Sequence, residues 1–96
     1  MMDLEEKKKK LKKIMSQVSG DFESIDGDLE HPMMIRGHGI VYCYVPSSRE
    51  FIKVNRGTVI YIIAQSKEDE EKYLVYTYDG HVVLLHEKEI FSLGFN

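Results

Sequence analysis

One stretch of the chain decides its fold: FIKVNRGTVIYIIAQSKEDEEKYLVYTYDGHVVLLHEKEIFSLGF, residues Phe51–Phe95. Within it, Thr58–Ala64 (TVIYIIA) is rich in β-branched and aromatic residues and lacks helical spacing of polar positions, which predicts a strand buried on both faces. Ser66–Lys72 carries six charged side chains in seven residues and is typical of a solvated loop. Tyr73–Tyr78 (YLVYTY) predicts a second strand of the same sheet.

The dipeptide Asp79-Gly80 comes directly after this second strand and predicts a tight hairpin. Because β-rich runs flank it on both sides, it indicates a two-residue type I′ loop, in which both central residues have positive φ. His81–Leu85 (HVVLL) is the expected returning strand. We expect one helical turn at His86–Glu89 and a last short strand at Ile90–Leu93.

The order of these elements resembles the second half of an SH3-like small β-barrel. The residues that carry the resemblance are TVIYIIA, YLVYTYDG, HVVLL and HEKEIFSL, within about half of the chain. The resemblance implies a fold but no single function, because SH3-like barrels include peptide binders, Tudor-type readers of methylated ligands and nucleic-acid modules.

Further strands are predicted ahead of this stretch. Met33–Ile35 is expected to begin the sheet, and Ile40–Val45 (IVYCYV) and Arg49–Val54 are expected to continue it. Alternation along IVYCYV divides its residues between two faces: Ile40, Tyr42 and Tyr44 on one, and Val41, Cys43 and Val45 on the other. The sheet should hold five to six strands, mostly antiparallel because the connections are short.

The N-terminal part predicts one amphipathic helix over residues 2–18. Asp3 is suited to the N-cap, lysines follow acids at i,i+4 spacing, and Gly20 stands where a helix ends. Its apolar stripe consists of Leu4, Leu11, Ile14, Met15 and Val18. A helix of this length is marginal alone in water, so it needs its own barrel, another copy or a partner as a surface.

The predicted fold is therefore α+β and mainly β, a helix followed by a small antiparallel SH3-like barrel or curved sheet. Residues 1–20 form the helix, 21–32 an acidic linker, and 33–96 the barrel domain. Ninety-six residues are enough for one domain but not for two. A single cysteine fits a reducing compartment, and we expect a cytoplasmic protein without a membrane span.

Charge is unevenly distributed along the chain. Residues 1–13 hold six lysines and three acids, whereas the remainder holds seven basic and thirteen acidic side chains. The N-terminus therefore carries +3 and the rest of the chain −6. Such an acidic body argues against wrapping a phosphate backbone, which normally takes clustered lysine and arginine.

Residues that could carry catalysis are not in catalytic patterns. The four histidines show no HxxxH spacing, and Cys43 lies in an apolar strand, where an inert buried thiol is expected. DGDLE lacks the ligand spacing of an EF-hand, and no glycine-rich phosphate loop joins a strand to a helix. We therefore expect no enzyme, no metal site and no cofactor.

Two groups of residues are candidates for binding: Lys8, Lys9, Lys12 and Lys13 of the helix, and Tyr73, Tyr76 and Tyr78 of one strand. Alternation places Tyr76 and Tyr78 on one face and Tyr73 on the other, which leaves open whether each face is core or binding surface. The leading hypothesis is a non-enzymatic protein-binding or regulatory module. It would act on another protein, or on itself, through a sheet edge, a tyrosine surface or the N-terminal helix.

Two alternatives remain at this point. The lysine-rich helix could bind nucleic acid with the barrel as its scaffold. The acidic body could instead act as an inhibitor that occupies the basic cleft of a nucleic-acid-binding partner.

Overall fold

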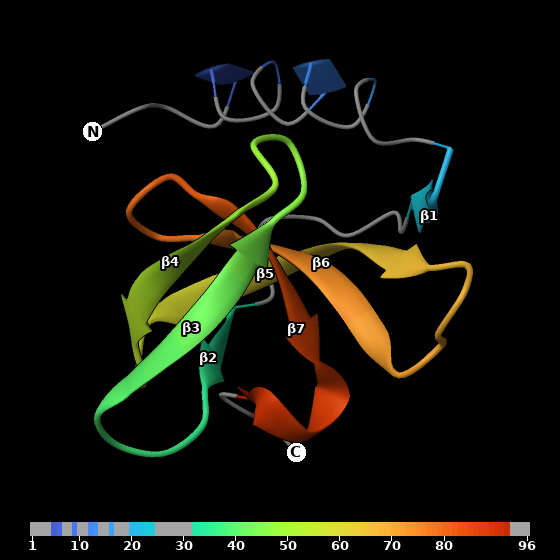
Figure 1. The fold of residues 1–96 in the computed structure, drawn as a ribbon. Helices are drawn as coiled ribbons and strands as arrows, with labels where there is room; N and C mark the ends of the chain where they lie inside the picture. Colours follow the sequence, from blue (N-terminus) through green and yellow to red (C-terminus); the bar gives the residue numbers. More distant parts are fainter. Residues whose placement is uncertain are drawn as a thin grey trace.

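The structure, a computed structural model, describes residues 5, 6, 9, 12, 13, 16, 20–24 and 32–92 (Figure 1). Its elements are eight strands and one short 3₁₀ helix: β1 (Phe22–Ser24), β2 (Met33–Ile35), β3 (Ile40–Val45), β4 (Glu50–Asn55), β5 (Val59–Ser66), β6 (Lys72–Thr77), β7 (Val82–His86), η1 (Glu87–Glu89) and β8 (Ile90–Ser92). The predicted strands at Met33–Ile35 and Ile40–Val45 are confirmed with the predicted bounds.

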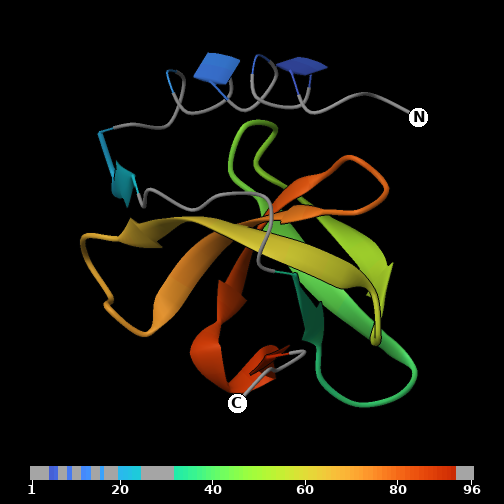
Figure 2. The ribbon, with the colours of Figure 1, turned by 180° about the vertical axis from the view of Figure 1, so that it is seen from behind.

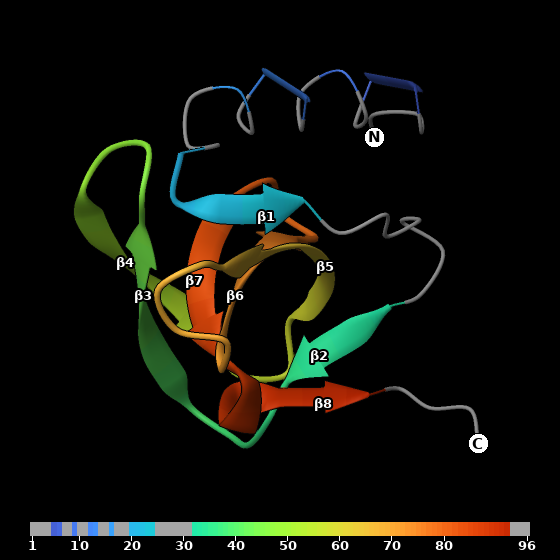
Figure 3. The ribbon, with the colours of Figure 1, turned by 90° about the vertical axis from the view of Figure 1, so that its right-hand side faces the viewer.

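All eight strands belong to one curved sheet, in which every strand pairing is antiparallel. The strand order is β4-β3-β7-β6-β5-β2-β8, and β1 pairs with β5 outside this path. From behind, β5 crosses the view in front of other strands of the sheet (Figure 2). From the side, the sheet curls so that β2 and β8 lie across the molecule from β3 and β4 (Figure 3). Within the described residues, β4 and β8 are the two end strands of the path.

Strand β5 organises the sheet because three other strands pair with it. One edge pairs with β6, and the other is shared between β2, along Val59 and Ile60, and β1, along Ala64 to Ser66. The register against β6 shifts between Ile62 and Ala64. An extra residue of this kind bends a strand and increases its twist, which suits a sheet that curls on itself.

The inner face of the curved sheet forms the main core. Its buried members come from six strands: Ile35, Cys43, Val54, Ile60, Val75, Val83 and Leu85. Alternation along β6 and β7 brings Val75, Val83 and Leu85 to this side together. β-Branched residues dominate the list, as expected for strands packed on a pleated surface.

A second, outer cluster lies on the opposite face of β5, β6 and β7. It contains Phe22, Ile63, Ala64, Leu74, Tyr76 and Val82. Phe22, which is 9% exposed, belongs to β1, and β1 crosses this face next to β5 (Figure 3). The central strands are therefore buried on both sides, which agrees with the continuous apolar run at Thr58–Ala64.

Strand β1 forms inside the segment for which the sequence predicts an acidic linker. Its register places Phe22 opposite Ser66 and Ser24 opposite Ala64. Lys67 N also donates to Asp21 O at 3.0 Å, which extends the pairing by one hydrogen bond. The edge of β5 supplies these backbone partners, so a three-residue strand forms without any periodicity of its own.

The turn between β6 and β7 is a three-residue loop, so the prediction of a two-residue type I′ turn is wrong. Thr77 N donates to His81 O (2.8 Å), so Thr77 and His81 close the hairpin and the loop between them consists of Tyr78, Asp79 and Gly80. Within the loop, Gly80 N donates to Thr77 O (3.0 Å). Gly80 has φ +98°, whereas Asp79 has no positive φ. This is the pattern of a type I turn followed by a left-handed glycine.

The predicted α+β class is also wrong: the structure is a mostly antiparallel β-sheet, and its described part holds no helix of seven or more residues. Residues 5, 6, 9, 12, 13 and 16 are locally helical, and all six are exposed. All six have polar or charged side chains, and none of them belongs to either core cluster. The eight strands also exceed the predicted five to six.

The apolar stripe of the predicted helix (Leu4, Leu11, Ile14, Met15 and Val18) lies outside the described residues. No helix in the described part of the chain is both long enough and apolar enough to cross a membrane.

Candidate binding surface

The outward face of the β3–β4 hairpin is apolar although it faces solvent. Ile40 is 54% exposed, Tyr42 is 64% exposed and Phe51 is 67% exposed, with Tyr44 half-buried beside them. We call these four residues the aromatic surface. A sheet face in water normally carries polar side chains, so a continuous group of large apolar ones indicates a contact site.

Cross-strand contacts hold the aromatic surface in place. Tyr44 and Phe51 are opposite each other in the register, with ring centroids 5.2 Å apart and planes tilted by 57°. Tyr42 is opposite Lys53, whose Nζ lies 6.0 Å from the centre of the tyrosine ring. These are the tilted aromatic and cation–π arrangements that stabilise sheet surfaces.

Strand β4 leaves one backbone edge open. Within the described residues its strand partner is β3 alone, and Arg56 N donates toward β3, to Gly39 O (2.8 Å). Because the N–H groups of successive strand residues point to opposite edges, those of Phe51 and Lys53 point away from β3. Unpaired groups at a sheet edge are a template for an added strand.

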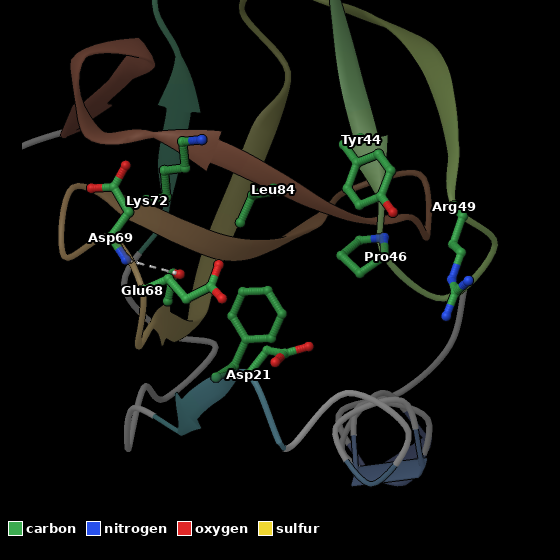
Figure 4. A pocket seen from close by; sticks show the side chains of 10 residues that line it. Asp21, Tyr44, Pro46, Arg49, Glu68, Asp69, Lys72 and Leu84 are labelled. Atoms are coloured by element: carbon green, nitrogen blue, oxygen red, sulfur yellow. Dashed lines mark hydrogen bonds between the residues drawn. The ribbon is translucent and has the colours of Figure 1, made fainter.

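A cavity of about 350 Å³ lies where the aromatic surface meets the outer cluster (Figure 4). Four of its lining residues are apolar or aromatic, and we call them the floor: Phe22, Tyr44, Pro46 and Leu84. Charged residues surround it: Asp21, Arg49, Glu68, Asp69 and Lys72. Tyr44 and Leu84 are register partners on the adjacent strands β3 and β7, so the floor of the cavity spans both strands.

The loop from β3 to β4 forms one side of this cavity and contains a strained residue. Ser48 N and Arg49 N both donate to Val45 O, at 3.2 and 2.8 Å. Arg49 has φ +60°, and among the described residues it is the one non-glycine with a positive φ. A side chain in this conformation costs roughly 1–2 kcal/mol. Strain of this kind is found at functional sites more often than elsewhere.

The structure separates the three tyrosines of the predicted binding set. Tyr76 is 2% exposed and belongs to the outer cluster beneath β1. Tyr73 packs against the inner core from the opposite face of β6, as the alternation predicts. Tyr78 is 57% exposed beside a small hollow that Thr58, Val59 and Asp79 also line. Of the three, Tyr78 therefore presents most of its side chain to solvent.

The predicted lysine group is only partly described. Lys9, Lys12 and Lys13 are exposed, and Lys8 lies outside the described residues. The ion pairs that the structure describes do not include Lys12 or Lys13, so no described ion pair joins these lysines to the aromatic surface or the cavity.

Cys43 is buried in the inner core, as its place in an apolar strand predicts. Burial raises the pKa of the Cys43 thiol above its ordinary value, an effect that Arg56 opposes and Glu89 reinforces.

His86 Nε2 lies 2.9 Å from Glu71 Oε2, while its Nδ1 accepts a hydrogen bond from Lys88 N at the start of η1. Among residues 20–24 and 32–92 and the six described positions before them, no three histidine, cysteine or acidic side chains form a group that could hold a metal.

Sequence reasoning misses Ile40, Tyr42 and Phe51 as candidate binding residues. The alternation in IVYCYV assigns Ile40 and Tyr42 to one face, but both faces of that strand are apolar, so the pattern does not show which one is buried. Phe51 joins this face only through the β3–β4 register, in which it is opposite Tyr44. Comparisons of the chain with protein-family models, with curated proteins and with solved structures gave no match, so the resemblance to SH3-like barrels stays a prediction.

Proposed function

We propose that this protein is a non-enzymatic protein-binding module that binds an extended segment of a partner protein along β4. The observation that carries the proposal is the aromatic surface, whose three most exposed members are 54–67% exposed. A strand added to β4 would pair with the open backbone groups of Phe51 and Lys53 and would extend the sheet beside those side chains. Main-chain pairing would supply affinity, and contacts to Tyr42 and Phe51 would supply specificity.

Charge also supports a protein partner over nucleic acid. The residues after position 13 carry −6, which repels phosphate backbones. The alternative of nucleic-acid binding through Lys8, Lys9, Lys12 and Lys13 has only the exposure of the three described lysines in its favour. The single cysteine fits a cytoplasmic location for the proposed module.

Selection from a random peptide library, displayed on phage and panned on the immobilised full-length protein, tests the proposal. We expect enriched peptides with alternating apolar residues, as an added strand requires. Binding of a selected peptide should slow amide hydrogen exchange at Phe51 and Lys53, since their N–H groups would then be hydrogen-bonded. Protection elsewhere, with these two amides unchanged, would contradict the proposed mode.

Two double variants provide the comparison. Tyr42→Ser with Phe51→Ser removes the two most exposed side chains of the aromatic surface and should weaken binding of the selected peptides at least about 10-fold, because aromatic anchors dominate such interfaces. Tyr78→Ser with Phe91→Ser removes the same kinds of side chain from positions that are 57% and 45% exposed outside the aromatic surface. The second variant should bind as the wild type does. Equal losses of peptide affinity in both variants would refute the assignment of peptide binding to the aromatic surface.

A further inference from the structure

Charge is unequal on the two sides of the cavity beside the aromatic surface. The charged lining residues from residues 20–24 and 66–72, which form one side, are three carboxylates and one lysine: Asp21, Glu68 and Asp69, with Lys72. The opposite side is the β3–β4 loop, where Arg49 is the charged lining residue. The cavity therefore has one strongly acidic side, which attracts a cation.

Asp21 and Glu68 are the carboxylates best placed to meet an occupant. In Figure 4 the Glu68 carboxylate lies between Leu84 and Asp21, while the Lys72 side chain extends away from Asp21. Within the described residues, neither Asp21 nor Glu68 has an ion-pair partner. Asp69 differs, because its Oδ1 already accepts a hydrogen bond from Glu71 N at 3.0 Å.

The floor of the cavity favours one kind of cation. Phe22 and Tyr44 offer aromatic rings, and Leu84 adds an aliphatic side chain to the same lining. A guanidinium group is planar, stacks on aromatic rings and presents a fork of donors that fits carboxylates. Its three-carbon stem packs on an apolar floor while the charged end stays at the rim.

We propose that this cavity receives an arginine side chain of the partner segment, an inference that rests on the proposed function. Tyr44 belongs both to the aromatic surface and to the cavity floor, so a segment docked along β4 has a continuous path from one to the other. The arginine stacks on Phe22 and Tyr44, and its donors bind Asp21 and Glu68.

The test needs no knowledge of the partner, because a single amino-acid derivative is a sufficient probe. Amide NMR spectra of the full-length protein are recorded with increasing N-acetyl-arginine methylamide. We expect shifts at Phe22, Tyr44 and Leu84 and a dissociation constant on the order of millimolar, as is usual for a ligand of this size. N-acetyl-citrulline methylamide has the same shape without the charge, and it should bind about 10-fold more weakly or worse.

Charge-matched variants assign the binding to the two carboxylates. Asp21→Asn with Glu68→Gln should weaken the arginine probe at least about 10-fold. Glu70→Gln with Glu87→Gln also removes two exposed acids, but neither of them lines the cavity, so it should change the affinity less than about twofold. Equal binding of arginine and citrulline, tighter binding of N-acetyl-glutamate methylamide, or no binding at all would overturn the proposal.

One other occupant would come from the chain itself. If its own lysines fill the cavity, replacing Lys8, Lys9, Lys12 and Lys13 by glutamine should strengthen binding of the arginine probe several-fold. That result would also overturn the proposal. The probe reports on the cavity alone, so its failure leaves peptide binding along β4 unaffected. Conversely, the arginine probe could bind while the peptide library gives no binding peptide. In that case the proposed function fails, but the assignment of the cavity as an arginine site does not.

Discussion

Tyr44 and Phe51 face each other across the β3–β4 hairpin with their ring centroids 5.2 Å apart, yet Phe51 remains 67% exposed. The pair therefore orders two aromatic rings without burying them. An exposed cross-strand pair contributes roughly 0.2–1 kcal/mol to stability, far less than a buried aromatic residue does. Its position suits recognition better than it suits folding.

Phe51→Ala should accordingly leave stability almost unchanged. We expect the free energy of unfolding in urea to fall by less than about 1 kcal/mol, because mainly the contact with Tyr44 is lost. Val54→Ala, in the inner core on the same strand, is the comparison and should cost roughly 2 kcal/mol or more. A loss as large for Phe51→Ala as for Val54→Ala would show that Phe51 is part of the folding core.

Phe22→Ala tests whether β1 belongs to the folded unit. Phe22 covers the outer cluster, and its removal from a buried site should cost roughly 3–5 kcal/mol. Glu23→Ala, at the exposed neighbouring position, should change stability by less than about 0.5 kcal/mol. Urea unfolding of both variants gives the measurement. Wild-type stability of Phe22→Ala would mean that β1 does not cover the sheet.

Arg49→Gly should stabilise the protein. Arg49 has φ +60°, so a glycine there relieves about 1–2 kcal/mol of strain, while the added freedom of the unfolded chain takes back about 0.5–1 kcal/mol. A net gain of between zero and about 1.5 kcal/mol is expected in thermal or urea unfolding. Ser47→Gly, in the same loop without a positive φ, should destabilise instead. Destabilisation by both changes would argue against the strained loop.

Gly80→Val tests the loop between β6 and β7. Gly80 has φ +98°, a conformation in which a β-branched residue is strained, so we expect a loss of roughly 1–3 kcal/mol. Asp79→Asn should have a smaller effect, since its side chain can still accept the hydrogen bond from Thr77 Oγ1 (2.5 Å). Unfolding free energies equal to the wild type for Gly80→Val would count against the left-handed glycine.

The sequence predicts the strands of this fold better than it predicts their environment. Ile40–Val45 and Met33–Ile35 are strands because period-two alternation and β-branching are local signals. Which face of IVYCYV lies inside depends on distant strands, and both faces are apolar, so the aromatic surface is not visible in the pattern. The dipeptide at Asp79-Gly80 locates the hairpin correctly, but loop length is decided by the Thr77 and His81 hydrogen bonds.

The candidate cavity has no local sequence signal at all. Asp21, Arg49 and Glu68 come from three separate loops, and only the pairing of β1 with β5 and the short β3–β4 loop bring them to one place. Phe22 lies in an acidic segment whose apolar residues (Phe22, Ile25 and Leu29) show no period-two alternation, so nothing in its neighbourhood predicts a strand. Tertiary pairing overrides local preference here, as it does for many edge strands.

Stability should depend on the Cys43 thiol at alkaline pH. Burial raises the pKa of this thiol above its ordinary value of 9.0; the Arg56 charge lowers it and the Glu89 charge raises it to a smaller extent. Below pH 9 the thiol is protonated in both states, so its contribution is fully present there. Above pH 9 the unfolded chain loses the proton while the folded chain keeps it, and stability falls by up to about 1.4 kcal/mol per pH unit.

Urea unfolding of the wild type and of Cys43→Ala between pH 7 and 10.5 gives the measurement. The variant has a lower stability at pH 7 because of the lost packing, but it should lose less on going from pH 9 to pH 10.5. Burial, followed by the Asp79 charge, also raises the pKa of Tyr76 above its ordinary value of 10.0, so both proteins should weaken further above pH 10. Parallel curves for the two proteins, or rapid labelling of Cys43 by a thiol reagent in the folded state at pH 8, would show that the thiol is accessible and ionises normally.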